Sequence, residues 1–215
     1  MVAPRYALVE TMHGGRAKAY EKRRPKLGPS AMIDCVGNEI TAFNYGSLHR
    51  CNCGRVSCTR LDTDQGVVLD CDGNELFEDR WGDINDYVED RACVRIWRPA
   101  PGVPQVCGFI DLGGNVVVPV EQTYYGRFYD VVTVVVTRDK ADRGRLIDVN
   151  NNTLYTPGNK SDWKISDYSG GLIYAMNLRT NERQLTNTKG EVVVPPHPEY
   201  SPNMPPTGYE NGIVG

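Results

Sequence analysis

The sequence predicts an all-β fold of five repeat units of about 38 residues, which form a small β-propeller-like ring with a Pro-rich C-terminal tail. The first observation is a turn motif, an Asx residue followed three positions later by Gly or Asn. Its copies begin at Asp34, Asp70, Asp111, Asp148 and Asn187, with intervals of 36, 41, 37 and 39 residues. Repeats of this period are typical of solenoids and propellers.

The second observation is the chemistry of that motif, which suits a tight hairpin. An Asp such as Asp111 accepts hydrogen bonds from backbone N–H groups ahead of it. Gly114, three residues later, supplies the positive φ that a type I turn with a following bulge needs. We therefore expect a two-stranded hairpin at each copy.

The third observation is the distribution of short apolar stretches. β-Branched residues precede and follow the turns, as at residues 67–69 and 116–118, and such residues favour strands. A third predicted strand precedes each pair, at residues 6–9, 55–58, 92–95, 132–136 and 172–175. Polar loops of variable length follow these strands. The longest is expected from His13 to Ser30 and is basic, with Arg16, Lys18, Lys22, Arg23, Arg24 and Lys26.

Aromatic residues recur where one unit joins the next. They are Tyr45, Trp81, Tyr129 beside Phe128, and Trp163 with Tyr168. Large rings at such positions are expected to fill the core between neighbouring sheets, because aromatic side chains dominate buried area. Stacking of a ligand on exposed rings is the alternative.

The motif order resembles the bacterial WG-repeat family. The best copy runs from Cys107 through Gly-Phe-Ile-Asp111 to Pro119, and Val194-Pro195 repeats its end. The family's Trp is absent from every unit, and Gly66, Gly108 and Gly144 retain only the Gly of that pair. The resemblance implies a propeller-like all-β scaffold without a shared set of catalytic residues.

The repeats predict one domain over residues 1–195 and a Pro-rich tail over residues 196–215. Six of the 14 prolines lie between residues 195 and 206, which favours extended polyproline-like backbone. No apolar run approaches the roughly 20 residues of a membrane span, and residues 1–5 lack the apolar core of a signal peptide. We therefore expect a cytoplasmic protein.

The cysteines are odd in number and scattered, which predicts no disulfide framework. A candidate metal site consists of His49, Cys51, Cys53 and Cys58, because zinc takes four Cys or His ligands. Cys58 lies in a predicted strand at a position that is apolar in other units, so packing is the favoured interpretation and a redox switch a further one. No metal and no cofactor are predicted.

Catalytic motifs are absent from the sequence. It contains no Gly-x-Ser-x-Gly elbow, no Gly-Lys-Ser/Thr phosphate loop and no His-x-x-x-His pair. The repeated Asx residues could be read as carboxylates for glycoside hydrolysis, but each already caps a turn. We expect no catalytic residues, and a hydrolase built from loop carboxylates is the least favoured function.

The distribution of charged residues is more informative about function than the catalytic motifs are. Between Asp62 and Asp90 there are eleven acidic residues and one base, Arg80, although the net charge of the chain is only −3. We predict that Glu78, Asp79, Asp83, Asp86, Glu89 and Asp90, here termed the acidic cluster, dock a basic protein partner. A solvated face with local ion pairs is the alternative, and neither a membrane nor a nucleic acid is the expected partner.

These observations predict a non-enzymatic protein-binding module, such as an inhibitor or immunity-type protein of a bacterium or a phage. The alternative is a small-ligand or glycan-binding propeller. Its pockets between units would be lined by Tyr124, Tyr125, Trp163 and Tyr168.

Overall fold

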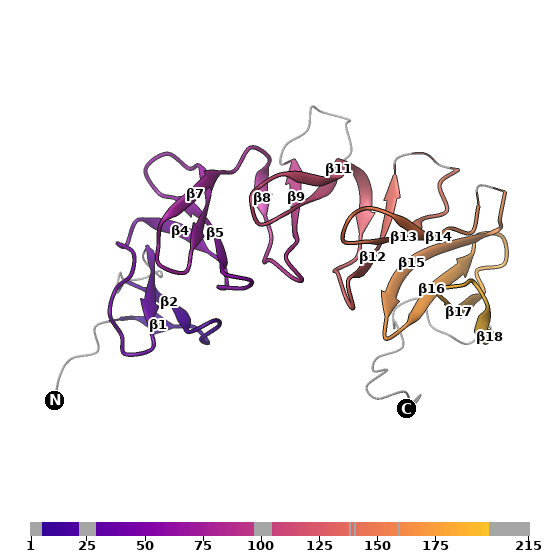
Figure 1. Cartoon of the computed structure of the whole chain (residues 1–215), viewed down its shortest axis with the longest axis horizontal. Coiled ribbons are helices and arrows are strands. Elements are labelled where there is room, and N and C mark those ends of the chain that lie inside the picture. Colours follow the sequence, from indigo (N-terminus) through magenta and orange to yellow (C-terminus); the bar gives the residue numbers. More distant parts are fainter. Residues whose placement is uncertain are drawn as a thin grey trace. The chain divides into compact units, whose positions relative to one another are not determined.

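The computed structural model describes residues 6–21, 29–96, 105–137, 139, 141–158 and 160–197. These residues form β-strands and turns and no helix, which confirms the all-β prediction (Figure 1). In this part of the chain no helix is long and apolar enough to cross a membrane. The basic residues at 22–26 and the tail beyond His197 lie outside the described residues.

The strands form three antiparallel sheets in which neighbours in the sequence are neighbours in space. The first sheet has seven strands, β1 (Leu8–Val9), β2 (Arg16–Tyr20), β3 (Ser30–Asp34), β4 (Tyr45–Leu48), β5 (Arg55–Arg60), β6 (Gly66–Asp70) and β7 (Glu75–Glu78). The second has seven, β8 (Gly82–Ile84), β9 (Ala92–Ile96), β10 (Cys107–Ile110), β11 (Val116–Tyr125), β12 (Val132–Thr137), β13 (Arg145–Asp148) and β14 (Thr153–Tyr155). The third has four, β15 (Trp163–Ser169), β16 (Leu172–Asn177), β17 (Arg183–Asn187) and β18 (Val192–His197).

The chain divides into two compact lobes. The N-terminal lobe comprises residues 1–105 and 109–116, and the C-terminal lobe comprises residues 106–108 and 117–215. The division passes through β10 and β11, so the Asx turn at Asp111 belongs to the N-terminal lobe.

The predicted Asx turns are confirmed at all five positions. In each, the lead side chain accepts hydrogen bonds from the amides two and four residues ahead, as Asp111 does from Gly113 and Asn115. The fourth residue has the left-handed backbone that the sequence predicts. Its φ is 89° at Gly37, 84° at Gly73, 79° at Gly114, 66° at Asn151 and 83° at Gly190.

A second kind of turn also recurs five times. Its two central residues both have positive φ, the signature of a type I′ hairpin. The pairs are Gly14-Gly15, Cys53-Gly54, Glu89-Asp90, Asp130-Val131 and Gly170-Gly171. In each, the residue before the pair and the residue after it form a hairpin, as Asn52 and Arg55 do. The sequence analysis does not predict these turns.

The structure corrects the assignment of the loop between His13 and Ser30. Arg16 and Lys18 lie on β2, which pairs along its whole length with β3. Ala17 and Ala19 alternate with them and are buried. Alanine is a weak strand former, so this alternation gives little signal in the sequence.

The described core consists of separate clusters between sheet segments. One joins Met32, Leu48, Val56 and Leu69 in the N-terminal lobe, and another joins Val134, Leu146, Ile165 and Ile173 in the C-terminal lobe. The predicted packing role is confirmed for three of the aromatic residues, since Tyr45 is 4%, Phe128 2% and Tyr168 7% exposed. Tyr129, by contrast, is exposed.

Candidate interaction surface

The acidic cluster lies on consecutive elements of the N-terminal lobe. Glu78 ends β7, Asp79 follows it, and Asp83 lies on β8. Asp86 comes shortly after β8, and Glu89-Asp90 form the type I′ turn that leads into β9. The order along the chain thus places these six residues on two strands and the segments that adjoin them.

Three members of the cluster have partners nearby in the fold. Glu78 lies 3.6 Å from Arg60, and Arg95 donates to Asp83 over 2.5 Å. Asp79 accepts hydrogen bonds from the backbone amides of Trp81 and Gly82, at 2.6 and 3.0 Å. Local ion pairs and turn capping therefore account for part of the cluster.

Asp86, after β8, contacts the segment between β4 and β5. His49, between β4 and β5, lies with Nδ1 3.3 Å from Asp86 Oδ1, and the Arg50 amide donates to the same oxygen over 3.2 Å. The hydrogen bond with His49 lowers the pKa of Asp86 below its usual value, although partial burial opposes this. Asp86 thus remains a carboxylate at neutral pH.

Glu89 and Asp90 occupy the tip of the turn. Both have left-handed backbone, with φ of 50° and 62°, and Asp90 is exposed. Two further carboxylates nearby have partners, because Arg60 also binds Glu75 and Arg16 lies 3.2 Å from Asp72. Among the described residues, Arg16, Arg60 and Arg95 pair with acidic residues of this stretch, which has eleven of them. The stretch therefore keeps an excess of negative charge.

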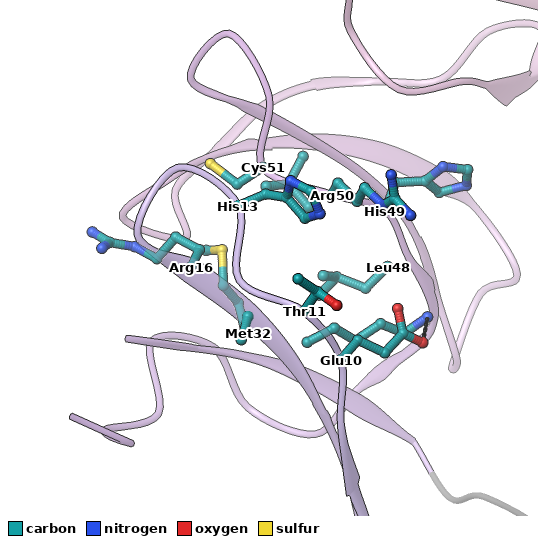
Figure 2. A pocket seen from close by; sticks show the side chains of 12 residues that line it. Glu10, Thr11, His13, Arg16, Met32, Leu48, His49, Arg50 and Cys51 are labelled. Atoms are coloured by element: carbon teal, nitrogen blue, oxygen red, sulfur yellow. Dashed lines mark ion pairs between the residues drawn. The ribbon is translucent and has the colours of Figure 1, made fainter. Parts of the chain in front are cut away.

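Two small pockets lie in the N-terminal lobe. The first, here termed the polar pocket, has a volume of about 40 Å³ and lies among β4, β5, β6 and the segment from Asp79 to Ile84. The second has a volume of about 20 Å³ and is lined by Met32, Leu48 and Cys51 with polar groups such as Glu10 and His13 (Figure 2). Both are far smaller than typical ligand sites of about 300–1,000 Å³.

The alternative ligand site was expected at Tyr124, Tyr125, Trp163 and Tyr168. Tyr168 is buried in the cluster with Val132 and Ile165, and Trp163 packs against the same cluster. Tyr124 and Tyr125 lie on β11, and their side chains are outside what the structure describes. The structure thus brings Trp163 and Tyr168 together as packing residues of β15.

The four residues of the candidate metal site have different environments in the structure. Cys51 forms a disulfide with Cys71, a single bridge that the cysteine pattern does not predict. Cys53 is exposed in a turn, and Cys58 is buried, which raises its pKa to about 12. Among the described residues, no group of three or more His, Cys, Asp or Glu side chains could hold a metal ion.

The sequence analysis misses the residues that connect one unit to the next. Arg16 Nε donates to the carbonyl oxygen of Cys71 over 2.6 Å, and Arg55 Nε to that of Leu112 over 3.0 Å. Each arginine directly follows a type I′ turn, and each acceptor is the second residue of an Asx turn. Equivalent placement of the two arginines, 39 residues apart, is the signal that could have revealed them.

Comparison with known proteins identifies no family. No protein-family model matches the chain, and no curated protein matches it. A solved structure of Hsv2 from Kluyveromyces lactis, with loop 6CD replaced by a Gly-Ser linker, is similar at 8% identity and a TM-score of 0.47, over 84% of this chain and 61% of that chain. The chain therefore spans about three fifths of that protein's length.

Two further structures show weaker similarity. A nidogen–laminin complex matches at 12% identity and a TM-score of 0.33, over 83% of this chain and 74% of that chain. Apo AztD from Citrobacter koseri matches at 11% identity and a TM-score of 0.34, over 89% of this chain and 59% of that chain. Likenesses at this level identify neither a family nor a function.

Proposed function

We propose that this chain is a non-enzymatic protein-binding module whose acidic cluster docks a basic protein partner. The observation that carries the proposal is the concentration of acidic residues on the elements from β7 to the turn before β9. Eleven acidic residues lie between Asp62 and Asp90, and the arginines Arg16, Arg60 and Arg95 pair with only some of them. Such a single-sign surface attracts an oppositely charged partner and orients its approach.

We infer further that the five units form a small β-propeller-like ring and that the chain is a divergent relative of WG-repeat proteins. The support is the recurrence of one hydrogen-bonded Asx turn and one left-handed turn in every unit. In such a repeat array the scaffold is shared, and function depends on what distinguishes individual units. The acidic stretch is one such distinction. It suits a protein that acts by occupying a partner's surface, such as an inhibitor or immunity-type protein of a bacterium or a phage.

The test uses Glu78, Glu89 and Asp90, of which Glu78 and Asp90 are exposed. The variant Glu78→Lys/Glu89→Lys/Asp90→Lys reverses three charges. It removes the exposed 3.6 Å ion pair of Glu78 with Arg60 and leaves Asp79, Asp83 and Asp86 with their partners. The matched control is Glu39→Lys/Glu121→Lys/Asp130→Lys, which changes the same total charge at exposed positions outside the acidic stretch. Both variants must first melt like the parent.

Partners are captured from native lysate on the immobilised parent protein, and association rates are then measured with the purified partner. We expect a basic partner, slower association with the cluster variant, and parent-like association with the control. Binding should also weaken as ionic strength rises from about 0.05 to about 0.5 M, because salt screens exposed charges. Association that ignores both the reversals and the salt would contradict the proposal.

A further inference from the structure

The polar pocket is lined largely by hydroxyl and charged side chains. Hydroxyl groups from two paired strands line it, with Ser47 on β4 and Ser57 and Thr59 on β5. The half-exposed side chain of His49 and the carboxylates of Asp79 and Asp83 complete its polar lining. All of these residues belong to the N-terminal lobe.

Ser57 lines the pocket and carries an unsatisfied hydroxyl group. The residue is only 5% exposed, and its Oγ is buried without a hydrogen-bond partner among the described residues. Buried hydroxyl groups in proteins are normally hydrogen-bonded. A group that enters the pocket and donates to Ser57 Oγ would satisfy it.

The charge of the pocket selects a cation. Asp79 is capped by two backbone amides, which are neutral, so its negative charge is not cancelled. Arg95 donates to Oδ2 of Asp83. The other oxygen of Asp83, Oδ1, could accept a hydrogen bond from a group that enters the pocket. The pocket lining therefore contains two carboxylates, one of which is paired with Arg95, and an anion would be repelled.

The size of the pocket selects the kind of cation. A volume of about 40 Å³ holds a compact group, such as an ammonium, and little more. An ammonium has three donors, whereas a guanidinium is a larger planar fork. Among the described residues there is also no group of side chains suited to a metal ion.

From these observations we propose that the polar pocket binds the ammonium group of a lysine side chain from the basic partner, with Ser57 Oγ and Asp83 as acceptors. This inference rests on the proposed function, because it names the partner group that the acidic cluster would receive. Asp79 and Asp83 belong to the cluster and also line the pocket. The pocket would thus provide the specific contact within a broadly attractive surface.

The experiment titrates the ¹⁵N-labelled full chain with three short peptides, N-acetyl-Gly-Lys-Gly-amide and its arginine and norleucine counterparts. Amide shifts are followed at residues 47, 57–59, 66 and 82–83. We expect saturable shifts at these amides with the lysine peptide, weaker binding of the arginine peptide, and no saturable shift with norleucine. The norleucine peptide has the same apolar stem without the charge.

Variants locate the site. Ser57→Ala removes the unsatisfied acceptor and Asp83→Asn removes one charge, and each should weaken binding of the lysine peptide about tenfold, as expected for a charge-assisted hydrogen bond. The matched control is Asp64→Asn, an exposed charge removal outside the pocket that tolerates the left-handed backbone there. It should leave binding unchanged.

Three outcomes would overturn the inference. They are the absence of saturable shifts with the lysine peptide, equal shifts with norleucine, and binding that Ser57→Ala and Asp83→Asn both leave intact. The two proposals can fail separately. If the partner's association depends on Glu89 and Asp90 but the lysine peptide does not bind, the pocket is not a lysine site and the proposed function stands. If the lysine peptide binds saturably but the acidic reversals do not change the partner's association, the pocket binds lysine and the proposed function is contradicted.

Discussion

Arg55 donates a hydrogen bond from Nε to the carbonyl oxygen of Leu112, 57 residues ahead in the chain. Arg16 makes the same contact with Cys71, 55 residues ahead, and in both cases the arginine follows a left-handed turn and the acceptor lies in an Asx turn. One polar contact therefore connects successive units twice in the N-terminal lobe. Its repetition indicates that the units are joined by a common geometry and not by unrelated packing.

Replacing either arginine should lower stability by a similar amount. Arg55→Met keeps an apolar stem of comparable length and removes the donor, so we expect the free energy of unfolding to fall by about 1 kcal/mol. Arg16→Met should behave alike, and Arg50→Met, at an exposed position, serves as the control. Urea unfolding measures all three. Arginine variants that unfold with the control would show that the contact has no energetic role.

The Asx turns provide a second test, at Gly114. Its φ is 79°, and a Cβ atom built there would lie 3.0 Å from the Phe77 ring. Gly114→Val should therefore destabilise the protein by about 1 kcal/mol or more, because backbone strain and a close contact act together. Asp111→Ala removes one turn acceptor and should cost on the order of 1 kcal/mol. A Gly114→Val protein with parent-like urea unfolding would mean that the turn is assigned wrongly.

The Asx turns were predictable because their information is local. An Asp, and a Gly or Asn three residues later, specify the acceptor and the left-handed backbone within a few residues. Local reasoning misses the role of the residue that follows this Gly or Asn. Asn38, Asn74, Asn115 and Asn152 each donate a side-chain hydrogen bond to the lead Asp, and Glu191 accepts one from Asn187.

Strands with weak patterns were not predictable in the same way. β2 depends on Ala17 and Ala19, and the joins between units contain a further strand, such as β8, that is only three residues long. The partners of the acidic cluster were also not predictable from the sequence. Arg60 and His49 precede the acids that they meet by 18 and 37 residues, so only the folded chain brings them together.

Val131 occupies a strained position. It has φ of 60°, where a β-branched residue is a rare outlier, and Gly15, Gly54 and Gly171 stand at the same place in other units. Val131→Gly should raise the free energy of unfolding by about 1 kcal/mol, because relief of strain exceeds the entropic cost of glycine. Val131→Asn should stabilise the protein too, since Asn tolerates this backbone. Thermal melting of both variants checks this, and two melting temperatures at or below that of the parent would refute it.

Acid should unfold the protein through its carboxylates. Hydrogen bonds lower the pKa of Asp34 through the Asn38 amide, of Asp70 through the Asn74 side chain, and of Asp86 through His49. A carboxyl with a depressed folded pKa stabilises the fold above its unfolded pKa of about 3.9, and this stabilisation is lost as pH falls through the folded value. Urea midpoints should therefore be steady from about pH 7 to 5 and drop below about pH 4.

Asp70→Asn provides the matched variant for that pH dependence. Asn187 shows that an amide can lead the same turn, with hydrogen bonds to the amides of Lys189 and Glu191. The variant should therefore fold and lose less stability between about pH 5 and 3 than the parent does. An unchanged acid profile would exclude Asp70 as one of the groups responsible.

The disulfide between Cys51 and Cys71 is not predicted by the cysteine pattern, so its contribution to stability needs a test of its own. It closes a loop with a sequence separation of 20, and a bridge of that span stabilises a fold by about 3 kcal/mol in the chain-entropy description. Thiol titration of the denatured, unreduced protein should find the five free cysteines Cys35, Cys53, Cys58, Cys93 and Cys107.

Cys71→Ser measures the contribution of the bridge and keeps the Arg16 contact, which uses only the backbone carbonyl of residue 71. We expect its urea midpoint to be lower than that of the untreated parent. It should equal the midpoint that the parent shows in the presence of reductant. Cys35→Ser, at the equivalent turn position of the preceding unit, is the control and should change neither. Seven titratable thiols in the unreduced protein, or unfolding that reductant leaves unaltered, would show that Cys51 and Cys71 contribute to the fold only by packing.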